Sequence, residues 1–131
     1  MQPILVVEDD LPLRTTVRSI LEDEGWGVET ARDEVAAMER VARARPALVV
    51  LDWGLREFDA QSLAAALRKS HGPDVPILLV TGDGQAAQKA ERVGALTYLR
   101  KPFEIDEFIK VVRTILHGRD IPDFRREPVE G

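Results

Sequence analysis

The chain alternates five times between a short strand candidate and a stretch with apolar side chains at helical spacing. The strand candidates are residues 4–7, 28–31, 47–51, 77–80 and 97–99. The first, third and fourth of these are uninterrupted apolar runs, which is typical of strands buried on both faces of a parallel sheet. The stretches between them end at glycine or proline, as helices do. This alternation predicts an α/β fold with a parallel sheet between two layers of helices.

Right-handed crossovers would make this fold a doubly wound, five-stranded, three-layer sandwich. We expect one domain over residues 1–118, since 131 residues correspond to one domain and suffice for a buried core. Residues 119–131 contain two prolines and show no periodicity, so we interpret them as a tail or the start of a linker.

Two aspartates are predicted to begin helices. Asp10 lies two residues before Pro12, which is favoured in a first helical turn, so we expect a capping role for Asp10 rather than contact with a metal. Asp33 precedes a predicted apolar helical stripe, formed by Val35, Met38, Val41 and Ala42.

Composition excludes several kinds of site and partner. The chain has no cysteine, which rules out disulfides, thiolate zinc sites and cysteine nucleophiles. A net charge of −5 without a basic stripe argues against direct binding of nucleic acid. The apolar run at residues 4–7 is too short for a signal peptide or a membrane span. We therefore expect a cytoplasmic protein with no membrane partner.

Polar side chains follow the apolar runs, where an open α/β sheet binds its ligands. They are Glu8, Asp9, Asp10, Asp52, Thr81 and Lys101. Two carboxylates about 4 Å apart repel by roughly 4 kcal/mol at an effective dielectric near 20, so such a pocket needs a cation. Oxygen ligands select a hard ion such as Mg²⁺ (or Mn²⁺). One carboxylate can then act as a nucleophile toward phosphorus, while an ammonium and a hydroxyl stabilise the transferring group.

Four segments together resemble the receiver domain of bacterial two-component response regulators, including the chemotaxis regulators. They are residues 4–10, 49–53, 79–82 and 98–103, and the resemblance covers residues 4–117. It implies a flavodoxin-like (βα)5 sheet with strand order 2-1-3-4-5. It also implies Mg²⁺-dependent transfer of a phosphoryl group from a sensor histidine kinase or a phosphotransfer protein. The resulting change of conformation would signal to an output domain or a target protein.

The resemblance assigns roles around the metal and the phosphoryl group. Asp52 resembles the phosphoacceptor and a metal ligand, Asp9 the direct Mg²⁺ ligand, and Glu8 the acid that reaches the metal through water. Gly54 would offer its backbone carbonyl to the metal. Lys101 resembles the lysine that pairs with the phosphate.

The resemblance also assigns a switch. Thr81 resembles the hydroxyl that moves toward the phosphoryl oxygens, and Tyr98 the aromatic residue that then turns inward, with packing alone as the less favoured interpretation of Tyr98. The bond between Lys101 and Pro102 is cis in the family. The output surface would be formed by the fourth helix, the fifth strand and the fifth helix.

The chain departs from the family at two places. Arg56 and Glu57 replace a frequent Pro-Gly pair. Leu96 and Thr97 stand where many DNA-binding regulators carry two acids that help to build a dimer. The sequence therefore does not decide whether the chain forms a phosphorylation-dependent homodimer. It also does not decide between a DNA-binding and a single-domain subfamily.

Other functions fit the sequence less well. A receiver-like interaction module that takes no phosphate would need a lost site residue, and none is lost. A metal-dependent phosphatase with Asp52 as nucleophile would usually need an acid where Gly54 stands. No glycine-rich phosphate loop follows the first strand, which argues against nucleotide binding. We expect self-phosphorylation and self-dephosphorylation without turnover of an external substrate, so the chain is not predicted to be a conventional enzyme.

Overall fold

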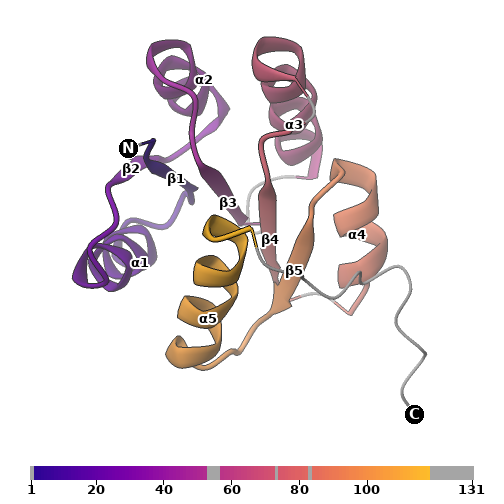
Figure 1. Cartoon of the computed structure of the whole chain (residues 1–131). Helices are drawn as coiled ribbons and strands as arrows, with labels where there is room; N and C mark the ends of the chain where they lie inside the picture. Colours follow the sequence, from indigo (N-terminus) through magenta and orange to yellow (C-terminus); the bar gives the residue numbers. More distant parts are fainter. Residues whose placement is uncertain (1, 53–56, 73, 83, 119–131) are drawn as a thin grey trace.

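The computed structural model describes residues 2–52, 57–72, 74–82 and 84–118, except for the side chains of residues 57–59. Strands and helices alternate throughout this part of the chain, as predicted (Figure 1). In chain order they are β1 (Ile4–Val7), α1 (Leu11–Asp23), β2 (Val28–Ala31), α2 (Glu34–Arg43), β3 (Leu48–Asp52), α3 (Glu57–His71), β4 (Ile77–Thr81), α4 (Ala86–Val93), β5 (Thr97–Arg100) and α5 (Ile105–Leu116). The predicted tail, residues 119–131, lies outside the described residues.

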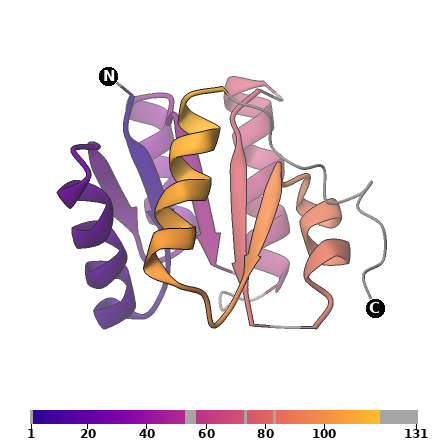
Figure 2. The same cartoon turned by 60° about the horizontal axis from the view of Figure 1, so that its bottom comes forward.

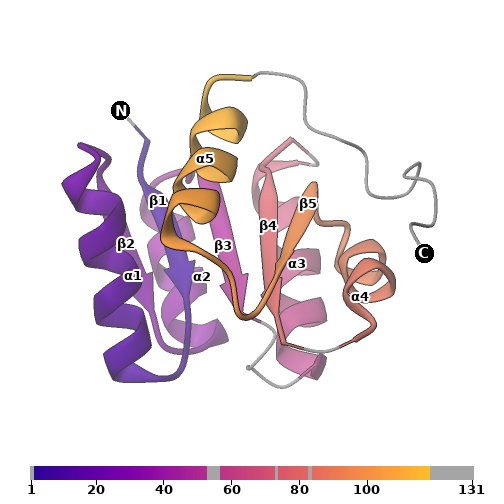
Figure 3. The same ribbon diagram turned by 90° about the horizontal axis from the view of Figure 1, so that it is seen from below.

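The strands form one parallel sheet with the order β2-β1-β3-β4-β5, which confirms the predicted fold class. Val7 pairs with Ala31 on one side and with Leu51 on the other, so β1 and β2 end at the same level and β3 ends one residue further on, at Asp52. Thr81 pairs with Arg100 at the ends of β4 and β5. This register places the carboxyl ends of the strands along one edge of the sheet (Figure 3).

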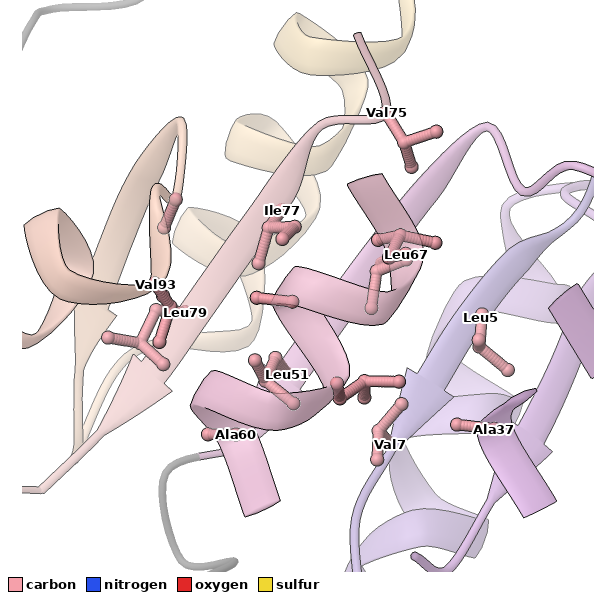
Figure 4. Close-up of a cluster of buried hydrophobic side chains, with 14 of the residues drawn as sticks. Leu5, Val7, Ala37, Leu51, Ala60, Leu67, Val75, Ile77, Leu79 and Val93 are labelled. Atoms are coloured by element: carbon pink, nitrogen blue, oxygen red, sulfur yellow. The ribbon is translucent and has the colours of Figure 1, made fainter. Parts of the chain in front are cut away.

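Helices cover both faces of the sheet, with α1 and α5 on one face and α2, α3 and α4 on the other (Figure 2). Alternate residues of each strand enter the two cores. Leu5 and Val7 pack under α2 and α3, whereas Ile4 and Val6 pack under α1 and α5. Figure 4 shows the first core, where Leu67 of α3 lies over the sheet. None of the described helices combines the length and the apolar character needed to cross a bilayer.

Two helix starts follow the prediction. Asp10 Oδ2 accepts a hydrogen bond from the backbone N–H of Leu13 at 2.9 Å, and Asp33 Oδ1 accepts one from that of Ala36 at 2.8 Å. Each aspartate thereby satisfies a donor that has no partner within its own helix.

The predicted stripe on α2 was wrong at both ends. Val35 is 70% exposed and Ala42 is exposed too, whereas the buried residues of this helix are Ala37 and Val41. Residues 35 and 37 differ by two positions, or about 200° around a helix, so burial of Ala37 turns Val35 toward solvent. Strands β3 and β4 also run one residue further than predicted, so Asp52 and Thr81 are themselves strand residues.

Candidate functional site

Three carboxylates meet at the carboxyl ends of β1 and β3. Glu8 and Asp9 follow β1 directly, and Asp52 is the last residue of its neighbour β3. One carboxylate oxygen from each of the three lies within 4.8 Å of the others. Glu8 and Asp52 are 4% and 5% exposed, whereas Asp9 is exposed. The structure thus brings together the acids that the sequence singled out, while their roles as metal ligands stay predictions.

Lys101 supplies a cation to this cluster from the end of β5. Its Nζ lies 3.0 Å from Asp52 Oδ1, and the two side chains are 34% and 7% exposed. The backbone N–H of Lys101 donates to the carbonyl of Thr81 at 2.8 Å, which fixes the lysine beside the end of β4. The peptide bond between Lys101 and Pro102 is cis, as the resemblance implied.

The two predicted switch residues lie on neighbouring strands. Thr81 ends β4 and is 1% exposed. Tyr98 pairs with Leu79 in the sheet, and its half-buried side chain packs against the core beneath α2, α3 and α4. Packing by Tyr98 is therefore observed, and its inward rotation stays a prediction.

Burial changes the acidity of Glu8. Loss of solvent is the main factor that raises the pKa of its carboxyl to about 8 from an ordinary value of 4.5. A hydrogen bond to Asp52, the charge of Asp52 and a hydrogen bond to Asp9 raise this pKa further, against the opposing hydrogen bond from the backbone of Asp10. Near neutral pH and without a cation, Glu8 therefore holds a proton.

The donor set fits a hard divalent cation. All three side chains offer oxygen, and two of them are buried, so a bound cation would offset both the loss of solvent and the repulsion that raise the pKa of Glu8. Beneath Glu8 and Asp52 lies a cavity of about 20 Å³. It is lined mainly by apolar side chains, namely Val6, Val7, Val17, Val50, Val80, Phe103 and Phe108. Apolar surroundings lower the local dielectric and strengthen each charge interaction at the site.

Two further residues complete the description of the site. Gly54, the predicted carbonyl ligand, lies outside the described residues. Arg14 of α1 was missed by the sequence analysis, although its Nη1 donates to the backbone carbonyl of Glu8 at 2.8 Å. In the sequence Arg14 is only a basic residue one turn into the first helix. An arginine that simply faces solvent has the same position and type, so the sequence could not distinguish the two.

Comparison with known proteins agrees with this geometry. Residues 4–113 match the family of the response regulator receiver domain. The chain is similar to response regulator MprA of Mycobacterium leprae (strain TN), with 38% identity over 96% of this chain and 55% of that protein. It is also similar to the nitrogen assimilation regulatory protein NtrX of Azorhizobium caulinodans, with 34% identity over 86% of this chain and 26% of that protein. The chain therefore spans about half, or less, of the length of these relatives.

Solved structures show the same similarity. Chemotaxis response regulator CheY4 of Vibrio cholerae superimposes with a TM-score of 0.78 at 29% identity, over 88% of this chain and 98% of that chain. NtrX from Brucella abortus superimposes with a TM-score of 0.78 at 34% identity, over 90% of this chain and 27% of that chain. The sequence match, the fold and the acidic strand ends agree, and the chain belongs to the response regulator receiver domain family of two-component systems.

Proposed function

We propose that this receiver domain accepts a phosphoryl group on Asp52 from a phosphohistidine of a sensor histidine kinase or a phosphotransfer protein. One observation carries the proposal. The buried carboxylate of Asp52 has an ammonium 3.0 Å away and two further carboxylates within 4.8 Å. A lone structural ion pair would not need the additional acids, and a bound cation would relieve the repulsion between them.

Glu8, Asp9 and Asp52 are the described residues that would hold Mg²⁺ or Mn²⁺, with the carbonyl of Gly54 added on the basis of the family resemblance. A bound divalent ion would supply positive charge to the oxygens of the transferring phosphoryl group. This assignment is supported by the oxygen-only donor set and by the burial of Glu8 and Asp52.

In the proposed reaction an oxygen of the Asp52 carboxylate forms a bond to phosphorus. The bond between phosphorus and the histidine nitrogen breaks and this nitrogen keeps the electron pair, while a proton on the other ring nitrogen allows the histidine to leave as neutral imidazole. Lys101, fixed beside the end of β4, neutralises charge on the phosphoryl oxygens. Attack by water later cleaves the acyl phosphate, so the protein returns to its first state without turning over an external metabolite.

The proposed signal begins at Thr81, whose hydroxyl would hydrogen-bond the phosphoryl group from the end of β4. Tyr98 would then turn inward and change the surface formed by α4, β5 and α5. We propose an output domain or a target protein as the reader of that surface. Homodimer formation is open, because Leu96 and Thr97 replace the acids of the familiar dimer. A cytoplasmic location also stays a prediction.

The test is incubation with acetyl phosphate and Mg²⁺, followed by mass spectrometry of the intact protein. We expect the wild type to gain the mass of one phosphoryl group and Asp52→Asn to gain none. Asp10→Asn is the matched control, since it removes a neighbouring acid and asparagine still caps α1. This control should be phosphorylated like the wild type, and a chelator should prevent phosphorylation of both.

Phosphorylation of Asp52→Asn to the wild-type extent would overturn the proposal. A wild type that neither gains the phosphoryl group nor binds Mg²⁺ would instead favour a receiver-like interaction module. Sustained hydrolysis of a generic phosphate ester by the wild type would revive the phosphatase alternative.

A further inference from the structure

Arg14 of α1 reaches back to the loop that joins β1 to this helix. Its Nη1 donates to the backbone carbonyl of Glu8 at 2.8 Å. Its backbone N–H donates to the carbonyl of Asp10, also at 2.8 Å, as part of the first helical turn. One residue of α1 therefore bonds the main chain both before and after Asp9, the acid that stands between these two carbonyls.

The carbonyl of Glu8 lies where the sheet runs out of donors. In a parallel ladder the N–H and the C=O of one residue bond the same neighbouring strand, at positions two residues apart. The N–H of Glu8 donates to the carbonyl of Ala31 at 3.0 Å, and Ala31 is the last residue of β2. The strand thus ends before the position of the next ladder donor, and the guanidinium of Arg14 supplies a charge-assisted bond to this carbonyl.

Asp9 depends on this main chain more than the other two acids do. Glu8 and Asp52 are 4% and 5% exposed, so the packing around them restricts their side chains. Asp9 is exposed, and the direction of its carboxylate is therefore set mainly by the peptide groups on either side of it. The peptide group that precedes Asp9 carries the carbonyl that Arg14 holds.

We propose that Arg14 is a positioning residue that orients Asp9 toward the divalent cation. It acts by fixing the peptide group between Glu8 and Asp9, and it contacts neither the cation nor the phosphoryl group itself. This inference rests on the proposed function, because the Mg²⁺ site that it serves is the one proposed there.

The charge of Arg14 and its positioning role predict opposite effects on the metal. A positive charge beside three carboxylates repels a cation, so loss of the charge alone would raise the affinity for Mg²⁺. Loss of the hydrogen bond would leave Asp9 less well oriented and would lower this affinity. The sign of the change therefore distinguishes the two.

Calorimetric titration with Mg²⁺ measures that sign. We expect Arg14→Met to bind Mg²⁺ about tenfold more weakly than the wild type, the usual cost of losing a group that orients a metal ligand. The loss should persist at high salt, which screens charge but does not restore orientation. Arg14→Lys keeps the charge and can donate one hydrogen bond to the same carbonyl, so it should bind nearly as well as the wild type.

Arg18→Met is the matched control, since it removes a cation of the same helix one turn further on. Arg18 is exposed and pairs with Glu22 at 3.1 Å, away from the loop between β1 and α1. We expect this variant to bind Mg²⁺ like the wild type.

Phosphorylation by acetyl phosphate at increasing Mg²⁺ separates the metal from the chemical step. In Arg14→Met the Mg²⁺ concentration that gives half the maximal rate should rise about tenfold, while the rate at saturating Mg²⁺ should equal that of the wild type. An unchanged maximal rate would also show that the variant is folded. A lower maximal rate would overturn the inference, because Arg14 would then act on the phosphoryl group or on the site as a whole.

The remaining outcomes separate this inference from the proposed function. If the wild type binds Mg²⁺ and Arg14→Met binds it equally well or more tightly, the positioning role is overturned and the proposed function stands. Binding by Arg14→Lys as weak as that by Arg14→Met would also overturn the positioning role, because a cationic donor would not be what holds the peptide group. A wild type that binds no Mg²⁺ would overturn both.

Discussion

Two parts of one helical layer are held to different degrees. α2 and α3 are joined at both ends, and we call them the clamped pair. At one end Ser62 Oγ donates to Glu34 Oε1 at 2.6 Å. At the other end the ring of His71 hydrogen-bonds the carbonyl of Val41 at 2.9 Å, and Arg45 donates to the carbonyl of His71 at 2.9 Å. On the same face of the sheet, α4 has its side-chain clamp from Arg68 at the carboxyl end.

The site is divided between the same two regions, the clamped pair and α4. The acids Glu8 and Asp52 stand at the ends of β1 and β3, which lie beneath the clamped pair. Thr81 stands at the end of β4, and the chain continues from it toward α4. The part that would receive the phosphoryl group therefore lies beneath the clamped pair, and the part that would report it leads into α4. The ion pair between Lys101 and Asp52 joins the two.

The largest effect should come from the core beneath the clamped pair. Leu67 of α3 is 1% exposed, and Leu67→Ala should lower the free energy of unfolding by about 2–5 kcal/mol through lost burial and the cavity left behind. Val35→Ala, at a position 70% exposed, is the control and should change it by less than about 0.5 kcal/mol. Urea unfolding measures both. A small effect of Leu67→Ala would mean that the clamped pair is not part of the rigid core.

The next effect should come from the link between the two parts. Lys101→Met removes the cation 3.0 Å from Asp52 and should slow phosphorylation by acetyl phosphate roughly 100-fold, the usual cost of losing one preorganised donor. Affinity for Mg²⁺ should rise, because a competing positive charge is gone. Rates from intact-mass time courses and titration with Mg²⁺ measure the two effects. Lys110→Met on the exposed side of α5 is the control. Equal phosphorylation rates for the two variants would show that Lys101 does not contribute to the reaction.

The pH dependence of stability tests the acidic cluster, and Glu8 in particular. The pKa of Glu8 is raised to about 8 in the folded protein from 4.5, so the metal-free folded state binds an extra proton between these values. This contribution to stability is complete below about pH 4.5 and is lost as the pH rises through about 8. Glu8→Gln should remove the slope, which thermal unfolding in the presence of a chelator measures.

Affinity for Mg²⁺ should show the opposite trend, since the proton and the cation compete for the same carboxyl. It should increase with pH up to about 8, by at most about tenfold per pH unit. A wild-type stability curve parallel to that of Glu8→Gln would show that Glu8 is charged in the metal-free protein.

The smallest effect sharpens the contrast between the clamped pair and α4. Ser62→Ala removes the hydrogen bond to Glu34 and should cost about 0.5–1.5 kcal/mol of stability, with Ser70→Ala on the exposed side of α3 as the control. It should leave the rate of phosphorylation and the response of α4 to beryllofluoride unchanged. A changed response of α4 would show that the clamped pair also takes part in the switch.

Much of the candidate site follows from local patterns in the sequence. Apolar runs that end on Glu8, Asp52 and Thr81 place these residues at one edge of the sheet, because parallel strands share the direction in which they end. The capping roles of Asp10 and Asp33 follow from the residues just after them. Such features depend on a few neighbours along the chain, which periodicity and turn chemistry describe well.

Local sequence patterns could not predict which face of a helix is covered or which distant residues are in contact. Periodicity alone placed Val35 on the buried side of α2, and the packing of Ala37 and Val41 reversed this. Arg68 and Gly94 are 26 positions apart, so no local pattern connects them.

The sequence by itself determined the order of the elements, the edge of the sheet that carries the polar groups and the membership of the acidic cluster. Tertiary structure alone decided that Glu8 is buried enough to hold a proton, that Lys101 lies against Asp52, and that α4 is fastened by Arg68 at one end. The physical reason is that burial and side-chain contacts across helices depend on how the layers pack. Hydrophobic periodicity fixes which face of an element is covered, but not which side chain of another element covers it.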